Sequence, residues 1–320
     1  MKKCVLVLCA LAWSQQVMCW GFYGHRTINN MAVFLLPPEM LALFKPNIDF
    51  LIEHSVDPDK RRYIVPGEGP RHYIDLDHYG NYPFNDLPRQ YSKAIAKFGT
   101  DSLQAHGVGP WWLQVMVGRL TEAFRTKDKN RILKLAAETG HYMADLHVPL
   151  HTSSNHNGQF TNQAGIHGFW ESRVPELLAE REWDFWIGHA AYIDDLLGFT
   201  WNRVLESAAA TDSVLKFEKL LSDKFREDKK YSFEWRNGKT IRQYSSAFTI
   251  AYNRRLNGMV ERRMRQAIFS VASIWYTAWI NAGQPELASL SDQGISIEDL
   301  KESAILNAAW EKAPKPDAHE

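Results

Sequence analysis

The sequence predicts an all-α protein: a single large helical domain with long ligand-bearing loops. Apolar residues recur at spacings of three and four, which is typical of amphipathic helices, and strand-like alternation is nearly absent. Two segments rich in Pro, Gly, Ser and Asn interrupt this pattern, and loops of such length inside a helical domain are usually functional. The expected helices are 27–36, 104–124, 131–146, 193–221, 241–282 and 297–310, and the expected loops are 53–87 and 151–166.

Residues 1–19 have the three-part layout of a secretory signal peptide. Lys2 and Lys3 precede an apolar stretch, 5–13, and a short polar region follows. The apolar stretch is too short for a permanent transmembrane anchor, so we expect a periplasmic or extracellular protein. Cleavage after Cys19 would make Trp20 the first residue; lipidation of Cys19 is the alternative, although 16–19 matches a lipobox poorly. We therefore expect a cleaved signal peptide (1–19), a main domain (20–283) and a C-terminal helix with a tail (284–320).

Composition excludes a disulfide-stabilised protein and a duplex-binding protein. All 3 cysteines lie within 1–19, so the mature chain must be stabilised by its core, by metal or by both. Removing Lys2 and Lys3 from the 37 basic side chains leaves 35 against 37 acidic ones, a formal charge of −2. A surface so balanced has no basic field to hold duplex nucleic acid. A phosphate-bearing partner must therefore be held locally, by metal or by a small basic cluster.

The placement of the histidines indicates a metal site. Four of them crowd a short part of the chain: His141, His147, His151 and His167. His141 and Asp145 are four residues apart on an expected helix, so their Cβ atoms lie about 6 Å apart on one face. His167 and Glu171 repeat this spacing. Imidazole nitrogen and carboxylate oxygen suit zinc at about 2.0–2.2 Å. One such pair is more often structural, but two pairs so close in the sequence favour a metal site.

These residues resemble a known family when they are combined with the start of the expected mature chain. Trp-x-x-x-x-His at 20–25, His-x-x-x-Asp-x-x-x-x-x-His at 141–151 and His-x-x-x-Glu at 167–171 follow the order of the trinuclear zinc phosphodiesterases. That superfamily comprises the single-strand-specific nucleases of the S-one/P-one type and the bacterial zinc-dependent phospholipases C, which are all-helical. The resemblance covers 20–171; beyond it only general helical character matches.

The resemblance implies three zinc ions. The implied ligands are Trp20, His25, Asp57, His72, His141, Asp145, His151, His167 and Glu171. His72, His141 and Asp145 would hold one ion together with an aspartate of the 53–87 loop. Our choice for that aspartate is Asp57, and Asp59 is the open alternative. Asp145 would also bridge this ion to the third.

The other two ions would be bound near the ends of the matched region. His151, His167 and Glu171 would hold the second ion. The amino nitrogen and carbonyl oxygen of Trp20, with His25, would hold the third. Because a freed α-amino group binds metal and a backbone amide nitrogen at neutral pH does not, this ion would require cleavage before Trp20.

The expected chemistry is hydrolysis of a phosphodiester. A carboxylate-bridged zinc pair lowers the pKa of a bound water towards neutrality and positions the hydroxide for in-line attack on phosphorus. Asp57 and Asp145 would therefore act in catalysis through the metals. Arg61, our choice among Lys60, Arg61 and Arg62, would neutralise charge on the phosphate, as a nearby arginine does in the nucleases. The alternative is a solvated basic loop.

The substrate is indicated by the residues that follow His72. In the nucleases an aromatic residue and an aspartate at these positions hold a nucleobase, and here they are Tyr73 and Asp75. Stacking is worth about 1–3 kcal/mol per base, so it would anchor single strands without a basic groove; a core role for Tyr73 is the alternative. Tyr23, Pro58 and Gly69 occupy the positions of the phospholipase choline pocket, which does not support a quaternary-ammonium cage.

Three functions follow from these observations. The leading hypothesis is an exported zinc-dependent phosphodiesterase that hydrolyses single-stranded nucleic acid, with 3′-nucleotides as further substrates. The second is a zinc-dependent phospholipase C acting on phospholipid. The third, from another class, is a zinc-binding protein without turnover. Two further histidines are not expected to bind metal. We expect His147 in the core or behind the ligands, and His156 in solvent, with contact to the substrate as the alternative.

Overall fold

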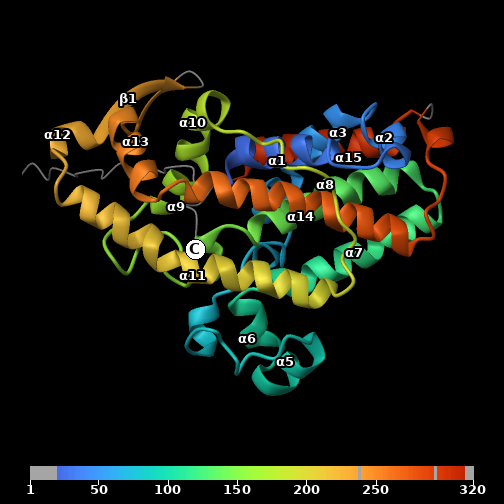
Figure 1. Ribbon diagram of the computed structural model, residues 1–320, viewed down its shortest axis with the longest axis horizontal. Coiled ribbons are helices and arrows are strands. Elements are labelled where there is room, and N and C mark those ends of the chain that lie inside the picture. The colour runs from blue at the N-terminus through green and yellow to red at the C-terminus, as the bar shows by residue number, and fades with distance from the viewer. Residues whose placement is uncertain (1–19, 237–238, 292–293, 314–320) are drawn as a thin grey trace, which may run out of the picture.

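The computed structural model describes residues 20–236, 239–291 and 294–313, so the expected signal peptide lies outside the described residues. The described chain is almost entirely helical, as predicted (Figure 1). Its α-helices are α1 (Gly21–Val33), α2 (Pro38–Phe44), α3 (Ile48–His54), α4 (Asp57–Arg62), α5 (Tyr91–Phe98), α6 (Thr100–Ala105), α7 (Gly109–Arg125), α8 (Lys129–Asp145), α9 (Ile166–Gly168), α10 (Val174–Glu182), α11 (Leu196–Ser222), α12 (Glu227–Lys230), α13 (Ser246–Arg255), α14 (Met259–Asn281) and α15 (Ile297–Lys312). The remaining elements are the 3₁₀ turns η1 (Gly69–Arg71), η2 (Leu76–Tyr79), η3 (Pro149–Thr152) and η5 (Ala288–Leu290), the π-helical turn η4 (Phe169–Arg173), and the antiparallel strands β1 (Tyr231–Arg236) and β2 (Lys239–Tyr244).

Helix α14 forms the centre of the hydrophobic core. It runs along the long axis of the molecule and packs against α1, α7 and α8 (Figure 1). Trp275 on α14 is fully buried, and its indole N–H donates to the Ala136 carbonyl of α8 at 2.9 Å. Burying an aromatic side chain of this size is worth about 1.5–3 kcal/mol. The long helices therefore form a rigid frame on which the last turn of α8 is held.

The last turn of α8 lies deep in the molecule and very close to α1. Every residue from 139 to 145 is buried. Gly140 permits the approach, because a Cβ atom at this position would collide with the Asn29 side chain of α1. His25, one turn earlier on α1, is thereby brought against His141, and the two rings stack with centroids 3.8 Å apart.

The start of α1 is held between α8 and η4. The Trp20 side chain is fully buried, and its indole N–H donates to the Ala144 carbonyl at 2.8 Å. Gly21 has φ +32°, and a Cβ atom here would lie 2.5 Å from the Ser172 hydroxyl oxygen. Only glycine fits this approach without a shift. The backbone of residues 20–21 is therefore fixed beside the expected ligands of α8 and η4.

Two parts of the chain differ from the sequence-based expectations. The expected helix 241–282 is divided into β2, α13 and α14. α13 and α14 are separate helices because Asn257 and Gly258, which lie between them, adopt positive φ values of 50° and 70°. β2 belongs to the β1–β2 hairpin, in which β1 alternates aromatic and polar residues, and the sequence Asn237-Gly238 is a strong hairpin signal. The expected loop 53–87 contains the short helix α4.

The C-terminal helix, predicted as 297–310, covers α4. Lys60 Nζ donates to Asn307 Oδ1 at 2.9 Å, and the Trp310 ring lies near those of Tyr63 and Phe22. Among the described residues, no helix combines the length and apolar character that a membrane crossing requires. The division of the chain at 283/284 stays a prediction.

Candidate metal centre

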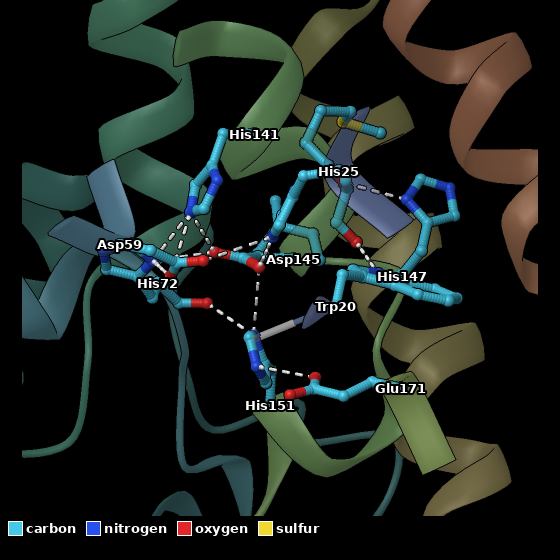
Figure 2. Close-up of polar contacts among 12 residues, drawn as sticks. Trp20, His25, Asp59, His72, His141, Asp145, His147, His151 and Glu171 are labelled. Carbon is cyan, nitrogen blue, oxygen red and sulfur yellow. Dashed lines mark hydrogen bonds and ion pairs between the residues drawn. The ribbon is translucent and has the colours of Figure 1, made fainter. Parts of the chain in front are cut away.

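Asp145 lies at the centre of a buried cluster of imidazoles (Figure 2). Its Oδ2 atom lies 2.9 Å from His72 Nδ1 and 3.2 Å from His141 Nε2, and its Oδ1 atom lies 3.4 Å from His25 Nε2. All four side chains are fully buried. The carboxylate therefore faces ligands from α1, α8 and the loop before η2 at once, which is the placement expected for a bridging ligand.

Asp59 completes this cluster. Its Oδ1 atom lies 3.7 Å from His141 Nε2 and 3.8 Å from His72 Nδ1, and its Oδ2 atom lies 4.0 Å from His25 Nε2. Figure 2 shows the Asp59 carboxylate between His72 and His141. The structure thus brings the alternative aspartate, and not the chosen one, to the imidazoles.

Asp57 faces a different set of partners. Its Oδ2 atom accepts a hydrogen bond from His54 Nδ1 at 2.6 Å, and its Oδ1 atom accepts one from Lys60 Nζ at 2.9 Å. Residues two apart on a helix differ by about 200° around the axis, so Asp57 and Asp59 point in nearly opposite directions. The sequence pattern alone did not reveal which face of α4 is turned to the imidazoles.

His151, His167 and Glu171 form a second cluster next to the first. His167 Nε2 lies 3.0 Å from Glu171 Oε2 and 3.1 Å from His151 Nε2, and His151 Nε2 lies 3.8 Å from the same carboxylate oxygen. The predicted i, i+4 pair is retained across the junction of α9 and η4. π-helical turns of this kind are frequent at functional sites.

Main-chain carbonyls orient three of the imidazoles. In each case the Nδ1–H donates to a carbonyl, which directs Nε2 into the cluster, where a neutral ring would offer it to a metal. The pairs are His141 with Ser55 (2.8 Å), His151 with His72 (2.9 Å) and His167 with His156 (3.1 Å). Sequence analysis missed these orienting groups, because a main-chain carbonyl has no side-chain signature.

The donor set fits zinc. Two atoms that are each about 2.0–2.1 Å from a tetrahedral zinc lie about 3.4 Å apart, and the separations within both clusters are close to this value. The described residues form three groups whose potential ligand atoms lie within 4.8 Å of one another: His25, His141 and Asp145; Asp59, His72 and His141; and His151, His167 and Glu171.

Several of these buried polar atoms have no hydrogen-bond partner among the described residues. They are His25 Nδ1 and Nε2, Asp59 Oδ2, His72 Nε2, Asp145 Oδ1 and both carboxylate oxygens of Glu171. A buried polar atom without a partner costs about 1–3 kcal/mol, and more when it is charged. So many such atoms in one place require compensation, which divalent cations would supply.

The pKa values agree with a site that needs cations. Burial lowers the pKa of His25 and of His72 to about 4 and raises the pKa of Glu171 well above its usual value. Burial also lowers the pKa of His141, but Asp145 foremost among its neighbours outweighs burial and raises it to about 9. A bound divalent cation would favour neutral imidazoles and ionised carboxylates, so metal binding and proton release are coupled here.

The Trp20 backbone lies beside both clusters (Figure 2). Its N–H faces the Glu171 carboxylate and opposes the burial that raises the pKa of that group, although the contact lacks the geometry of a full hydrogen bond. The nitrogen expected to bind the third ion is therefore close to Glu171. Whether it is a free amine depends on residues outside the described chain, so its ligand role stays a prediction.

A cavity of about 100 Å³ adjoins the ligands. Its lining residues are Arg62, His72, Tyr73, Asp75, Leu150, His151, His156 and His167. The two expected substrate residues, Tyr73 and Asp75, thus lie in its wall. His156 also lines it and is half-buried instead of solvated; burial, followed by the charge of His167, lowers its pKa to about 3.

The basic residue in the cavity wall is Arg62, not Arg61. Arg61 Nη1 donates to Glu138 Oε1 at 2.7 Å, and Arg61 Nε lies 3.7 Å from Glu68 Oε2. Arg61 therefore belongs to an ion-pair network behind the ligands and does not line the cavity. Like the choice of aspartate, the choice of arginine depends on the orientation of α4.

Asp75 has an unusual environment for a carboxyl group. Burial, followed by the charge of Asp77, raises the pKa of Asp75 to about 7, and its Oδ2 atom lies 3.6 Å from His106 Nδ1.

His147 lies outside the clusters, as expected. It is fully buried, donates from Nδ1 to the Met143 carbonyl at 2.9 Å and contacts Ser270 through Nε2.

The family comparison agrees with this geometry. A family described as zinc dependent phospholipase C matches residues 24–246, and the chain belongs to that family. The matched region contains every expected metal ligand except Trp20. Comparison with curated proteins gives no match. The predicted superfamily and fold class are therefore confirmed, and the protein is a zinc-dependent phosphoric ester hydrolase.

Proposed function

We propose that the protein is an exported phospholipase C, which hydrolyses the bond between a phospholipid headgroup phosphate and diacylglycerol. The observation that carries this proposal is the convergence of three ligand groups around Asp145, next to a cavity with Arg62 in its wall. Family membership supports the phospholipid more than the nucleic acid that the sequence first suggested. The cavity, at about 100 Å³, has room for a phosphate group but not for acyl chains.

We propose three zinc ions, held by the residues of the two clusters. Asp59, His72, His141 and Asp145 would hold one, His151, His167 and Glu171 a second, and His25, Asp145 and Trp20 the third. Bound zinc supplies a water molecule whose pKa is lowered towards about 7 and a Lewis acid for the phosphate oxygens.

The side chains around the cavity determine how the substrate is held. Arg62, in the cavity wall, would donate to a non-bridging phosphate oxygen and neutralise the charge that develops there. Asp145 fixes three imidazoles in one orientation, because it contacts His25, His72 and His141 together. In the reaction, the oxygen of water bonds to phosphorus, the bond from phosphorus to the glycerol oxygen breaks, and that oxygen takes up a proton.

A second candidate function, hydrolysis of single-stranded nucleic acid, is favoured by one observation. Tyr73 and Asp75 both line the cavity, as expected for residues that stack on a nucleobase and hydrogen-bond to it. Under this alternative, Tyr73→Ala should weaken nucleic acid hydrolysis by about 1–3 kcal/mol, or roughly 5- to 150-fold. Hydrolysis of a small aryl phosphodiester should change little, and equal losses on both substrates would exclude base stacking.

A substrate panel separates the candidates. Metal-replete protein is given phosphatidylcholine, single-stranded DNA, RNA and a 3′-nucleotide, each with and without chelator. We expect chelator-sensitive release of diacylglycerol. Chelator-sensitive release of acid-soluble nucleotides alone would replace the proposal with the nuclease, and zinc uptake without turnover of any substrate would contradict both.

A further inference from the structure

The β1–β2 hairpin carries two large aromatic side chains that the fold leaves in solvent. Phe233 is 66% exposed and Trp235 is 73% exposed. Tyr231 points to the same side of β1 because side chains alternate along a strand. Tyr231, however, packs against the core, with its ring centroid 5.0 Å from that of Tyr244. The aromatic face of β1 therefore begins in the core and continues outward into solvent.

The hairpin has a modest excess of basic residues. Its strands contain Arg236, Lys239 and Arg242 against Glu234, a formal charge of 3 − 1 = +2, whereas the whole sequence has a formal charge of +0. Arg242 is the cross-strand partner of Phe233, and its guanidinium lies over the Tyr231 ring at 3.5 Å. The exposed aromatic residues and the Arg242 guanidinium thus share one face of the hairpin.

The hairpin is attached to the turn that bears Glu171. Arg173, two residues after Glu171 in η4, is buried and donates through Nη2 to Glu234 Oε1 at 2.6 Å and through Nε to the Tyr244 carbonyl at 3.1 Å. The Tyr244 ring stacks on Phe169 of η4 with centroids 3.9 Å apart. In Figure 1 the hairpin lies at the end of the molecule that also contains α9 and α10. The hairpin therefore has a fixed position relative to the metal ligands.

We propose that this hairpin docks the protein onto an anionic phospholipid surface, an inference that rests on the proposed phospholipid substrate. Aromatic side chains such as Trp235 partition into the headgroup region, where an apolar ring and a polar edge are both accommodated. The guanidinium of Arg242, the cross-strand partner of Phe233, would be attracted by anionic headgroups. Because Arg173 and Phe169 join the hairpin to η4, docking would hold the cavity close to the lipid headgroups during successive turnovers.

The test compares the metal-replete parent protein with the double variant Phe233→Ala/Trp235→Ala. Vesicles are made of phosphatidylcholine and phosphatidylserine analogues in which a methylene replaces the glycerol oxygen on phosphorus, so that binding is measured without hydrolysis. We expect vesicle partitioning of the double variant to fall about 10-fold or more. Partitioning of the parent should fall when salt is raised or phosphatidylserine is omitted.

Trp186→Ala is the matched control. Trp186 is 69% exposed, similar to Trp235, but lies outside the hairpin. The Trp186→Ala variant should bind vesicles like the parent. All variants should hydrolyse a soluble short-chain phosphodiester at the parent rate and keep the parent melting temperature, since neither Phe233 nor Trp235 belongs to the core or to the cavity wall.

The remaining outcomes would overturn the docking inference, reassign the hairpin or contradict the proposed function. Equal sedimentation of parent and double variant, or no binding by the parent, would overturn the docking inference. A change from dimer to monomer in the double variant would instead assign the hairpin to contact with a second copy of the chain. A parent protein that binds vesicles but releases no diacylglycerol from ordinary phospholipid would leave docking intact and contradict the proposed function.

Discussion

Replacing Asp59 with Asn tests the metal centre most directly, because Asp57 offers a matched control on the same helix. Both side chains are buried carboxylates on α4, and both exchanges remove one charge without changing shape. Asp59 faces His72 and His141, whereas Asp57 faces His54 and Lys60. Only Asp59→Asn should therefore change metal binding.

The expected magnitude follows from linkage between metal binding and folding. If the loss of one carboxylate ligand weakens zinc affinity about 100-fold, the stabilisation by zinc falls by about 2.7 kcal/mol. For a chain of this size that corresponds to a loss of about 4 °C in melting temperature with zinc present. Hydrolysis should fall at least as far as metal occupancy does.

The effect of Asp59→Asn on stability should reverse when chelator removes the zinc. Burial raises the pKa of Asp59, so at neutral pH its charged form opposes folding of the metal-free protein, and Asn removes that penalty. Asp59→Asn should then be at least as stable as the parent. For Asp57, burial raises the pKa, but hydrogen bonds and charges from His54 and Lys60 outweigh it and lower the pKa overall. Asp57→Asn should lose stability both with and without zinc.

Calorimetry with and without chelator measures stability. Mass spectrometry measures zinc content, and a phosphodiester assay measures activity. If Asp59→Asn retains zinc and activity while Asp57→Asn loses them, the assignment of the α4 face is wrong. If both variants lose stability equally under both conditions, Asp59 has a structural role only.

Three further predictions concern the cavity and the N-terminus. Arg62→Ala should lower kcat on a phosphodiester by about 10²–10³-fold, while Arg61→Ala should mainly lower melting temperature because it breaks the pair with Glu138; the opposite pattern would return the phosphate role to Arg61. The pKa of Asp75 is raised from 3.8 to about 7, so the folded form holds a proton that the unfolded chain releases. The contribution of Asp75 to stability should therefore be lost between about pH 4 and pH 7, so in melting curves Asp75→Asn should gain stability relative to the parent as the pH rises through this range. A chain with extra residues before Trp20 should bind one zinc ion fewer than a chain that begins at Trp20; equal zinc content and activity would refute ligation by the amine.

Local spacing predicted the parts of the site that depend on one helix turn. His141 with Asp145 and His167 with Glu171 are i, i+4 pairs, so their proximity follows from backbone geometry alone. The choice of Asp57 and Arg61 failed to anticipate the structure for a different reason. It depends on the rotation of α4 about its axis, which is set by contacts with α8 and α15 that are distant in the sequence.

The sequence after α11 contains turn signals that were concealed by the helical spacing of its apolar residues. Asn237-Gly238 and Asn257-Gly258 are both turn signals in the sequence; β1 and β2 flank the first, and α13 and α14 flank the second. The apolar residues on either side still fit a helical period, so 241–282 resembled one helix. A positive φ at Asn257 and Gly258 is a local preference that outweighs the longer-range pattern.

The position of the metal centre at the end of α8 explains why its ligands bear on both folding and catalysis. The last carbonyls of a helix carry a partial negative charge of about −0.5, which favours cations within the last turn, and His141 and Asp145 lie in that turn. The other ligands come from α1, α4, the loop before η2, η3, α9 and η4, so bound ions would cross-link segments from His25 to Glu171. Residues 20–320 contain no cysteine, and no disulfide shares this role. Removing the ions should therefore loosen the whole ligand-bearing half of the core, and activity and cooperative unfolding should respond to chelator over the same range of concentration.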